Sequence, residues 1–284
     1  MNAPERSLLL CTNGAPEGIA ALTYGAWLAQ VVHLPVTLLG IVEAPASHRT
    51  VEEALHESRA QLEAQGIANT IIRREGRARD VIPREAKPGQ HLVVLGPLGR
   101  PLWRQWLRGR SARRLMPHLS VPLLFAPTAH CQLDSILVTT GALEHAASLE
   151  RCALHLARKV GATLIILHVI TKTSYSYPTA DEIEARRDDF LQANVPQARN
   201  LRALLEEARA MGVTASFEMR HGTIVREIID EARRGQYDLV VMGSKHSSSA
   251  LRGLALPDVT AEVMASLEVP VLSVQAGQTC ILAG

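Results

Sequence analysis

The chain has 284 residues, of which 47% are hydrophobic and 20% charged, and its formal net charge is +2. This length is enough for two globular domains with full cores, and the balanced charge provides no field that would attract nucleic acid. The first residues lack a basic segment followed by an apolar core, and no apolar run approaches the roughly 18 residues of a membrane span. We therefore expect a cytoplasmic protein with neither export nor membrane insertion.

The first half alternates short apolar runs with segments of helical periodicity. Strands are predicted at residues 7–12, 36–43, 69–74, 91–95 and 122–126, and helices at 15–32, 50–65, 77–86 and 108–118. Continuous apolar runs such as LVVL and LIIL are typical of strands that are buried on both faces. This pattern predicts a parallel sheet with helices on both sides, connected by right-handed crossovers.

The second half repeats the first. The aligned positions are Gly14 with Gly141, Val42 with Val169, Gly76 with Gly222, Gly96 with Gly243 and Pro122 with Pro270. We therefore predict an α/β protein of two tandem Rossmann-like domains, residues 1–130 and 131–284, each with a five-stranded parallel sheet. The short apolar fifth strands, VPLLFA and VPVLSV, suit edge pairing, either within the chain as a pseudo-dimer or in a homodimer.

The second copy is longer than the first by about 19 residues, which we place in a helical insertion at about residues 171–212. Thr179 followed by Glu182 predicts the start of a helix, and Pro196 should kink this helix or divide it in two. Apolar residues such as Phe190 recur on one helical face. We expect this arm to pack against the first domain, with contact to a second subunit or to a ligand as alternatives.

Four cysteines, Cys11, Cys131, Cys152 and Cys280, are scattered along the chain without C-x-x-C spacing. This distribution predicts reduced, mostly buried thiols and no metal site.

Two loops follow strands at the place where a parallel sheet binds ligands, beyond the carboxyl ends of its strands. They are TNGAPEG after the first strand and GPLGRPLWRQWLRGR after the fourth. Glycine permits positive φ and lets backbone N–H groups approach a phosphate. The second loop is no P-loop, because no Gly-Lys-Ser/Thr follows it, so the residues alone leave a phosphate cradle and a plain tight turn as alternatives.

The spacing of Gly96, Gly99 and Gly109, with nine residues between the last two, resembles the glycine motif of nucleotide-binding universal stress proteins. The resemblance covers nearly the whole chain and points to the tandem two-domain form of that family. It implies a stress-response regulator that binds ATP or ADP, with Mg²⁺, in domain 1. The residues it assigns to the nucleotide are Thr12, Asn13, Val42, Gly96, Gly99, Gly109, Arg110 and Ser111.

Several positions depart from the family pattern. Asn13 stands where the family has Asp, although its amide oxygen can still accept a hydrogen bond, and Arg110 stands where Ser or Thr is expected. In the second copy His246, Pro257 and Asp258 replace glycine and serine, and a proline or an aspartate is unfavourable beside phosphate. We therefore expect nucleotide in domain 1 and a degenerate, structural loop in domain 2, with the serines of SKHSSS as an alternative anion site.

Six arginines lie within 15 residues and are interleaved with two tryptophans: Arg100, Arg104, Arg108, Arg110, Arg113 and Arg114, with Trp103 and Trp106. A solvated basic helix face explains them best, while neutralisation of a bound phosphate and nucleic-acid contact stay as alternatives.

Motifs for catalysis are missing from the sequence, which has no H-E-x-x-H and no G-x-S-x-G. His168, on an apolar strand, is expected to be a core histidine and not a ligand. We expect no catalytic residues and at most a slow ATPase. The alternative function is a nucleotide-free tandem module that acts through an unknown protein partner.

Overall fold

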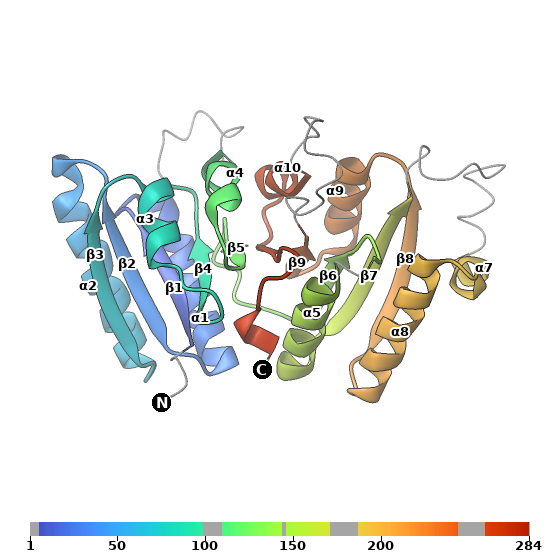
Figure 1. Ribbon diagram of the computed structural model, residues 1–284. Coiled ribbons are helices and arrows are strands. Elements are labelled where there is room, and N and C mark those ends of the chain that lie inside the picture. Colours follow the sequence, from blue (N-terminus) through green and yellow to red (C-terminus); the bar gives the residue numbers. More distant parts are fainter. Residues whose placement is uncertain (1–5, 99–109, 144–145, 171–186, 244–258, 284) are drawn as a thin grey trace.

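The computed structural model describes residues 6–98, 110–143, 146–170, 187–243 and 259–283 (Figure 1). The strands of the first half are β1 (Ser7–Thr12), β2 (Val36–Val42), β3 (Asn69–Glu75), β4 (His91–Leu95) and β5 (Leu123–Phe125). Those of the second half are β6 (Ser135–Thr139), β7 (Thr163–Ile170), β8 (Ala215–His221), β9 (Leu239–Met242) and β10 (Val271–Ser273). Within the described residues they form one sheet in the order β3-β2-β1-β4-β5-β10-β9-β6-β7-β8.

The two halves meet at the centre of this sheet. All strand pairs inside each half are parallel, whereas β5 and β10 pair antiparallel, with Leu124 opposite Leu272. The predicted pairing of the two fifth strands within one chain is thus confirmed. Behind β10, the amide of Gln278 donates to the Val121 carbonyl at 3.0 Å, which ties the end of the chain back to the first half.

Helices cover both faces of the sheet, as predicted. One face carries α1 (Ile19–Val32), α2 (His48–Ala64), α5 (Ala147–Val160) and α8 (Pro196–Ala210), and the other carries α3 (Ala78–Glu85), α4 (Arg110–Leu115), α9 (Ile224–Gly235) and α10 (Val259–Ser266). Side chains alternate along β1, so that Leu8 and Leu10 enter the first core while Leu9 and Cys11 enter the second. The described part also contains the 3-10 turns η1 (Pro16–Gly18), η2 (Pro45–Ser47), η4 (Met116–His118) and η7 (Ile281–Ala283).

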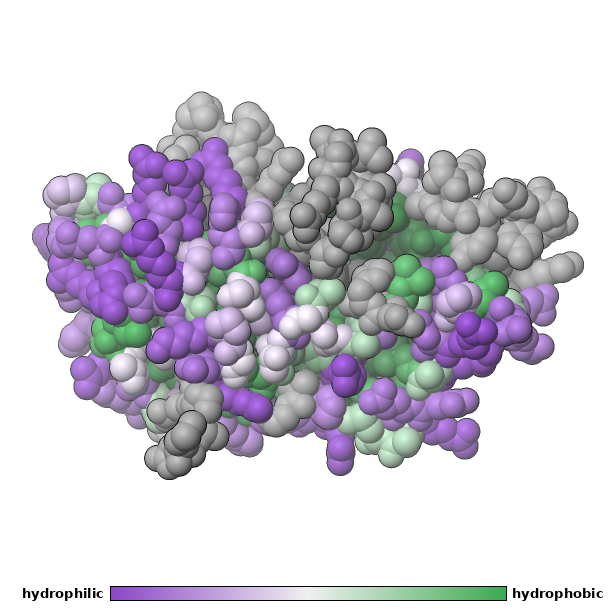
Figure 2. All heavy atoms as spheres, viewed as in Figure 1, coloured by the Kyte–Doolittle hydropathy of each residue, from purple (hydrophilic) through white to green (hydrophobic). Residues whose placement is uncertain are grey.

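The surface in the view of Figure 2 is mainly hydrophilic over the first half, around β3 and α3 at the left. Hydrophobic residues show in smaller patches between polar ones. Among the helices that the structure describes, none has the length and apolar character that a bilayer crossing needs.

The insertion predicted at 171–212 is partly an ordinary helix of the fold. α8 connects β7 to β8 and covers the same face as α2, which connects β2 to β3, and Leu201 and Leu204 lie in the core shared with that face. Pro196 is the first residue of α8, and the short α7 (Arg187–Gln192) precedes it, so the proline does divide two helices. The predicted helix start at Thr179 lies outside the described residues.

α7 packs on its own half of the protein and not on the first domain, where we had expected the arm to lie. The ring of Phe190 stacks on His168 at 5.7 Å and lies 6.3 Å from the ring of Phe217 on β8. The apolar stripe of this segment therefore serves to cover the edge of the sheet.

The expectation of reduced thiols is wrong for one pair. Cys152 on α5 and Cys280, next to η7, form a disulfide that joins residues 128 positions apart. Spacing along the chain carries no signal for such a pair, because only the return of the C-terminal segment to α5 brings the two residues together. Cys11 is a buried free thiol, as predicted, and burial raises its pKa, whereas Cys131 is exposed.

Candidate functional site

The site predicted from sequence lies where the connections of β1 and β4 separate. β1 and β4 are neighbours in the sheet, but β1 leads to α1 on one face and β4 leads to the helices on the other. Such a switch point leaves a crevice at the carboxyl ends of the strands, which is the usual ligand position in this class of fold.

Residues 12–15 form a tight turn at the end of β1. The hydroxyl of Thr12, which is 2% exposed, accepts the N–H of Gly14 at 3.1 Å, and the amide oxygen of Asn13 accepts the N–H of Ala15 at 3.2 Å. Gly14 has φ +76°, and a Cβ there would lie 2.6 Å from backbone atoms of Thr50 and Val51 at the start of α2. Glycine is required here for two reasons, the positive φ and the close approach of a helix backbone.

Glu43 connects this turn to α3. One of its carboxylate oxygens accepts from the amide of Asn13 at 3.3 Å, and the other accepts the N–H of Ala78, the first residue of α3, at 3.0 Å. The residue before it, Val42, accepts the N–H of Gly76 at 3.0 Å. Val42 is among the residues predicted from the sequence, whereas Glu43 is not. The available signal was an acidic residue placed directly after an apolar strand.

Gly96, directly after β4, packs against the start of α1. A Cβ at this position would lie 2.9 Å from the Cβ of Ala21 and 3.2 Å from the Cα of Gly18. A Cβ at Gly18 would in turn lie 4.0 Å from the Thr12 hydroxyl. Gly14 and Gly96 thus let the turn after β1 and the end of β4 pack closely against α2 and α1, with Gly18 next to Thr12, at the carboxyl end of the sheet. We call these three glycines, with Thr12, Asn13 and Glu43, the glycine corner.

Four of the predicted site residues meet at this edge: Thr12, Asn13, Val42 and Gly96. Gly99 and Gly109 lie outside the described residues. Arg110 and Ser111 begin α4, and nothing is described of their side chains. Of the arginine cluster, Arg114 is described and is exposed.

The second half repeats the turn with different residues, and it corrects our alignment by one position. Thr140 accepts the N–H of Ala142 at 2.8 Å, as Thr12 does for Gly14, and Ala142 also has a positive φ, +50°. The counterpart of Gly14 is therefore Ala142, and Gly141 takes the place of Asn13. Matching Gly14 with Gly141 is wrong by one position because the residue with positive φ is glycine in the first half and alanine in the second.

By the same register His168 occupies the place of Gly40. A Cβ at Gly40 would lie 2.6 Å from Leu55 of α2, whereas the second half accommodates a whole imidazole ring there. His168 is 6% exposed, and its Nδ1–H donates to the Thr140 carbonyl at 2.9 Å, so the predicted core histidine is confirmed. Burial lowers the pKa of His168.

Next to it, the Thr140 hydroxyl donates to the carboxylate of Glu150 at 2.5 Å. Glu150 is 9% exposed, and burial raises its pKa. The second half therefore satisfies the polar groups of its turn internally.

The sequence model of the Universal stress protein family matches residues 5–127 and again residues 133–275. A universal stress protein from Archaeoglobus fulgidus is 19% identical, with a TM-score of 0.73 over 95% of this chain and 96% of its own.

A functionally unknown protein from Pseudomonas aeruginosa is 18% identical, with a TM-score of 0.70 over 96% of this chain and 93% of its own. Both structures agree with this chain in fold, and no curated protein matches it in sequence. Because the family model matches each half in turn and together covers most of the length, the chain belongs to the universal stress protein family, in its tandem two-domain form.

Proposed function

We propose that the protein is a stress-response regulator that binds adenine nucleotide, ATP or ADP, at the glycine corner of its first half. The observation that carries this proposal is the combination of two glycines, Gly14 and Gly96, whose surroundings leave no room for a Cβ, and a polar pair, Asn13 and Glu43, at the same switch point. Bare backbone lets a phosphate approach main-chain N–H groups, while amide and carboxylate oxygens accept hydrogen bonds from ribose hydroxyls. Mg²⁺ would be held largely by the phosphates.

Glu43 compensates for the missing aspartate. The family resemblance implies an acid at position 13, but here Asn13 donates to a carboxylate that comes from the end of the neighbouring strand. An aspartate at 13 would place two carboxylates about 3 Å apart, where they repel each other. We infer that the acid that accepts from the ribose is Glu43 and that Asn13 orients it.

Calorimetry with ATP on the full chain tests this assignment. We expect the wild-type protein to bind, Asn13→Asp to weaken binding about tenfold through repulsion with Glu43, and Asn13→Asp with Glu43→Gln to recover most of the loss. Asn194→Asp makes the same chemical change at an exposed site of the second half and should leave the affinity unaltered.

Two results would contradict the proposal. A wild-type chain that binds no ATP would favour the nucleotide-free interaction module. Equal weakening in the single and double variants would remove Glu43 from the ribose site while leaving nucleotide binding itself in place.

A further inference from the structure

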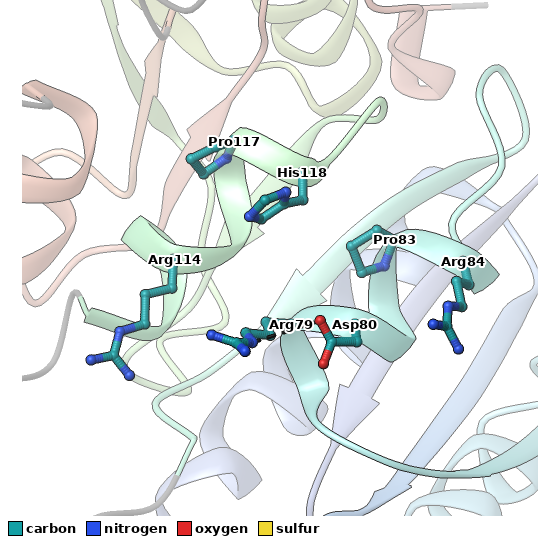
Figure 3. A pocket seen from close by; sticks show the side chains of 7 residues that line it. All are labelled: Arg79, Asp80, Pro83, Arg84, Arg114, Pro117 and His118. Atoms are coloured by element: carbon teal, nitrogen blue, oxygen red, sulfur yellow. Dashed lines mark ion pairs between the residues drawn. The ribbon is translucent and has the colours of Figure 1, made fainter.

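A second cleft in the first half lies between α3 and the segment formed by α4 and η4. Figure 3 shows side chains from these elements around it. It has a volume of about 990 Å³ and is lined by Arg79, Asp80, Pro83, Arg84, Arg114, Pro117 and His118. None of these residues belongs to the glycine corner.

The lining carries an excess of positive charge, with three arginines against one aspartate. Asp80 pairs with Arg79 at 3.6 Å. Within the part of the chain that the structure describes, Arg84 and Arg114 form no ion pair with an acidic group. The next acid along α3, Glu85, is held by Arg74 of β3 at 2.7 Å and therefore does not neutralise the cleft.

Two prolines make the walls of this cleft rigid. Pro83 lies inside α3, and Pro117 lies in the first turn of η4. Their fixed φ means that little conformational freedom is lost at these positions when a ligand binds.

The second half shows that the fold does not require this charge. The helices can be matched because α3 and α9 begin with equivalent hydrogen bonds, from Val81 N–H to the Arg77 carbonyl and from Glu227 N–H to the Thr223 carbonyl, both 3.0 Å. Similarly, Pro122 after α4 and Pro270 after α10 each accept from the neighbouring strand at 3.0 Å.

In this register Arg84 corresponds to Asp230 and Arg114 corresponds to Glu262. Asp230 forms an ion pair with Arg226 at 3.6 Å. Both unpaired arginines of the first half are thus replaced by acids in the second. The same two helices pack on the same sheet with either charge, so the basic lining serves something other than folding.

We propose that the cleft between α3 and α4 binds a small polyanion that carries two or more phosphate groups. Guanidinium groups pair with phosphate oxygens in a planar, bidentate way. Figure 3 shows Arg79, Arg84 and Arg114 spread along the lining, so a ligand must extend over several phosphate groups to reach more than one of them. The volume is that of a small-molecule site. This inference does not depend on nucleotide binding at the glycine corner.

Calorimetry with inorganic tripolyphosphate on the full chain tests the proposal at low salt. We expect wild-type protein to bind tripolyphosphate more tightly than orthophosphate, and Arg84→Gln with Arg114→Gln to weaken tripolyphosphate binding by roughly tenfold or more. Arg226→Gln, the same substitution in the corresponding helix of the second half, should leave the affinity unchanged. Arg84 and Arg114 are exposed, so the double variant should fold normally, which circular dichroism and the melting temperature verify.

A further variant separates this cleft from the glycine corner. Asn13→Asp, which we expect to weaken ATP binding, should bind tripolyphosphate like the wild type. The proposal is overturned by a wild-type chain that does not bind tripolyphosphate, by equal affinities of the wild type and the double variant, or by loss of tripolyphosphate binding in Asn13→Asp.

Discussion

The two halves of the chain build the same turn after their first strand, but they surround it differently. The hydroxyls of Thr12 and Thr140 accept the N–H groups of Gly14 and Ala142, respectively. Both Gly14 and Ala142 have a positive φ. Between the threonine and the residue with positive φ, the first half has Asn13, which donates to Glu43 directly after β2, whereas the second half has Gly141. Both halves keep the threonine hydroxyl that accepts the backbone N–H of the turn, while the side chains around this hydrogen bond differ.

In the second half, side chains of the protein itself surround the turn. His168 from β7 and Glu150 from α5 both bond to Thr140, and Phe190 of α7 stacks on the histidine. In the first half the position of His168 is Gly40, against which Leu55 of α2 packs. A side chain of the sheet thus takes space that a helix occupies in the other copy.

Substitutions at the two positions with positive φ should give the largest difference in stability between the halves. Gly14→Ala brings a Cβ to 2.6 Å from the backbone of α2 at φ +76°, and we expect it to cost about 3 kcal/mol of unfolding free energy. Ala142→Gly releases a strained backbone and should change stability by less than about 1 kcal/mol. Urea unfolding of both variants measures this, and equal losses would refute the asymmetry.

The disulfide is a second difference between the halves that should affect stability. Cys152 on α5 takes the place that Tyr24 has on α1, and its bond to Cys280 closes a long loop of the second half. Replacing both cysteines by alanine should lower the free energy of unfolding by about 3 kcal/mol. Thermal unfolding tests this against Cys131→Ala, which alters an exposed free thiol and should be neutral. An unchanged midpoint in the double variant would show that this bond does not stabilise the protein.

The glycines after the fourth strands should differ less. A Cβ at Gly96 meets Ala21 at 2.9 Å, whereas a Cβ at Gly243 finds its nearest neighbour, Leu149, at 3.7 Å, an ordinary contact. We expect Gly96→Ala to cost about 2 kcal/mol and to weaken ATP binding, and Gly243→Ala to cost less than about 1 kcal/mol. Chemical unfolding and calorimetry of the two variants would reveal whether the first half alone depends on this close packing.

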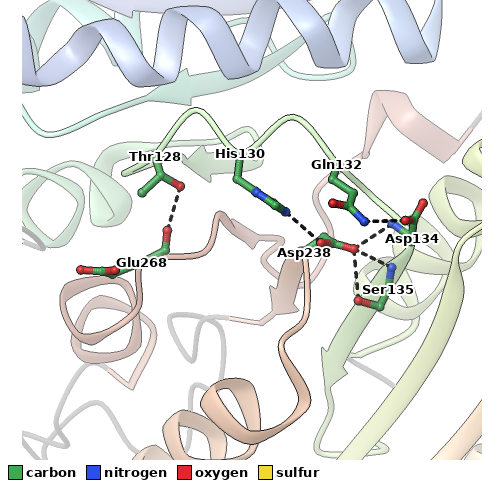
Figure 4. Close-up of polar contacts among 7 residues, drawn as sticks. All are labelled: Thr128, His130, Gln132, Asp134, Ser135, Asp238 and Glu268. Carbon is green, nitrogen blue, oxygen red and sulfur yellow. Dashed lines mark hydrogen bonds and ion pairs between the residues drawn. The ribbon is translucent and has the colours of Figure 1, made fainter.

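A further contrast lies at the start of the fourth strand of each half, where His91 is the first residue of β4 and Asp238 is the residue before β9. Figure 4 shows Asp238 among its partners in the connection between the halves. Its carboxylate accepts from Asp134 N–H at 2.8 Å, from Ser135 N–H at 2.9 Å and from His130 at 3.1 Å. Burial opposes ionisation, but these bonds outweigh it and lower the pKa of Asp238, while burial lowers the pKa of His91.

These two groups should give the smallest effect, in different pH ranges. The lowered pKa of Asp238 stabilises the fold above the unfolded value of about 3.9, and this stability is lost as the pH falls through that value toward the folded pKa. The lowered pKa of His91 means that the unfolded chain takes up the proton first, so stability falls as the pH drops below about 6.5. Each contribution should be about 1 kcal/mol.

Urea midpoints measured from pH 7 to pH 3 separate the two groups. The stability difference between wild type and Asp238→Asn should shrink below about pH 4, and that between wild type and His91→Gln should change between about pH 7 and pH 5. A constant difference for Asp238→Asn across the whole range would mean that its hydrogen bonds do not favour the ionised form.

The sequence predicted the secondary structure of the first half closely. The runs at 7–12 and 91–95 are β1 and β4 with the same bounds, because an apolar run between polar turns admits few other registers. It also located the turn at Asn13 and Gly14, since an amide followed by glycine favours positive φ. It did not locate Glu43, because the contact of Glu43 with Asn13 depends on the carboxyl ends of β1 and β2 lying side by side.

The sequence by itself determined the repeat, the parallel sheet and the glycine-rich edge, because periodicity and backbone conformation are local properties of the chain. Only the tertiary structure decided that β5 and β10 join the halves into one sheet, that Cys152 meets Cys280, and that α8 corresponds to α2. It alone also placed Arg84 and Arg114 around one cleft. These features join residues that are distant in the chain, and such contacts depend on how the helices and strands pack and on no local pattern.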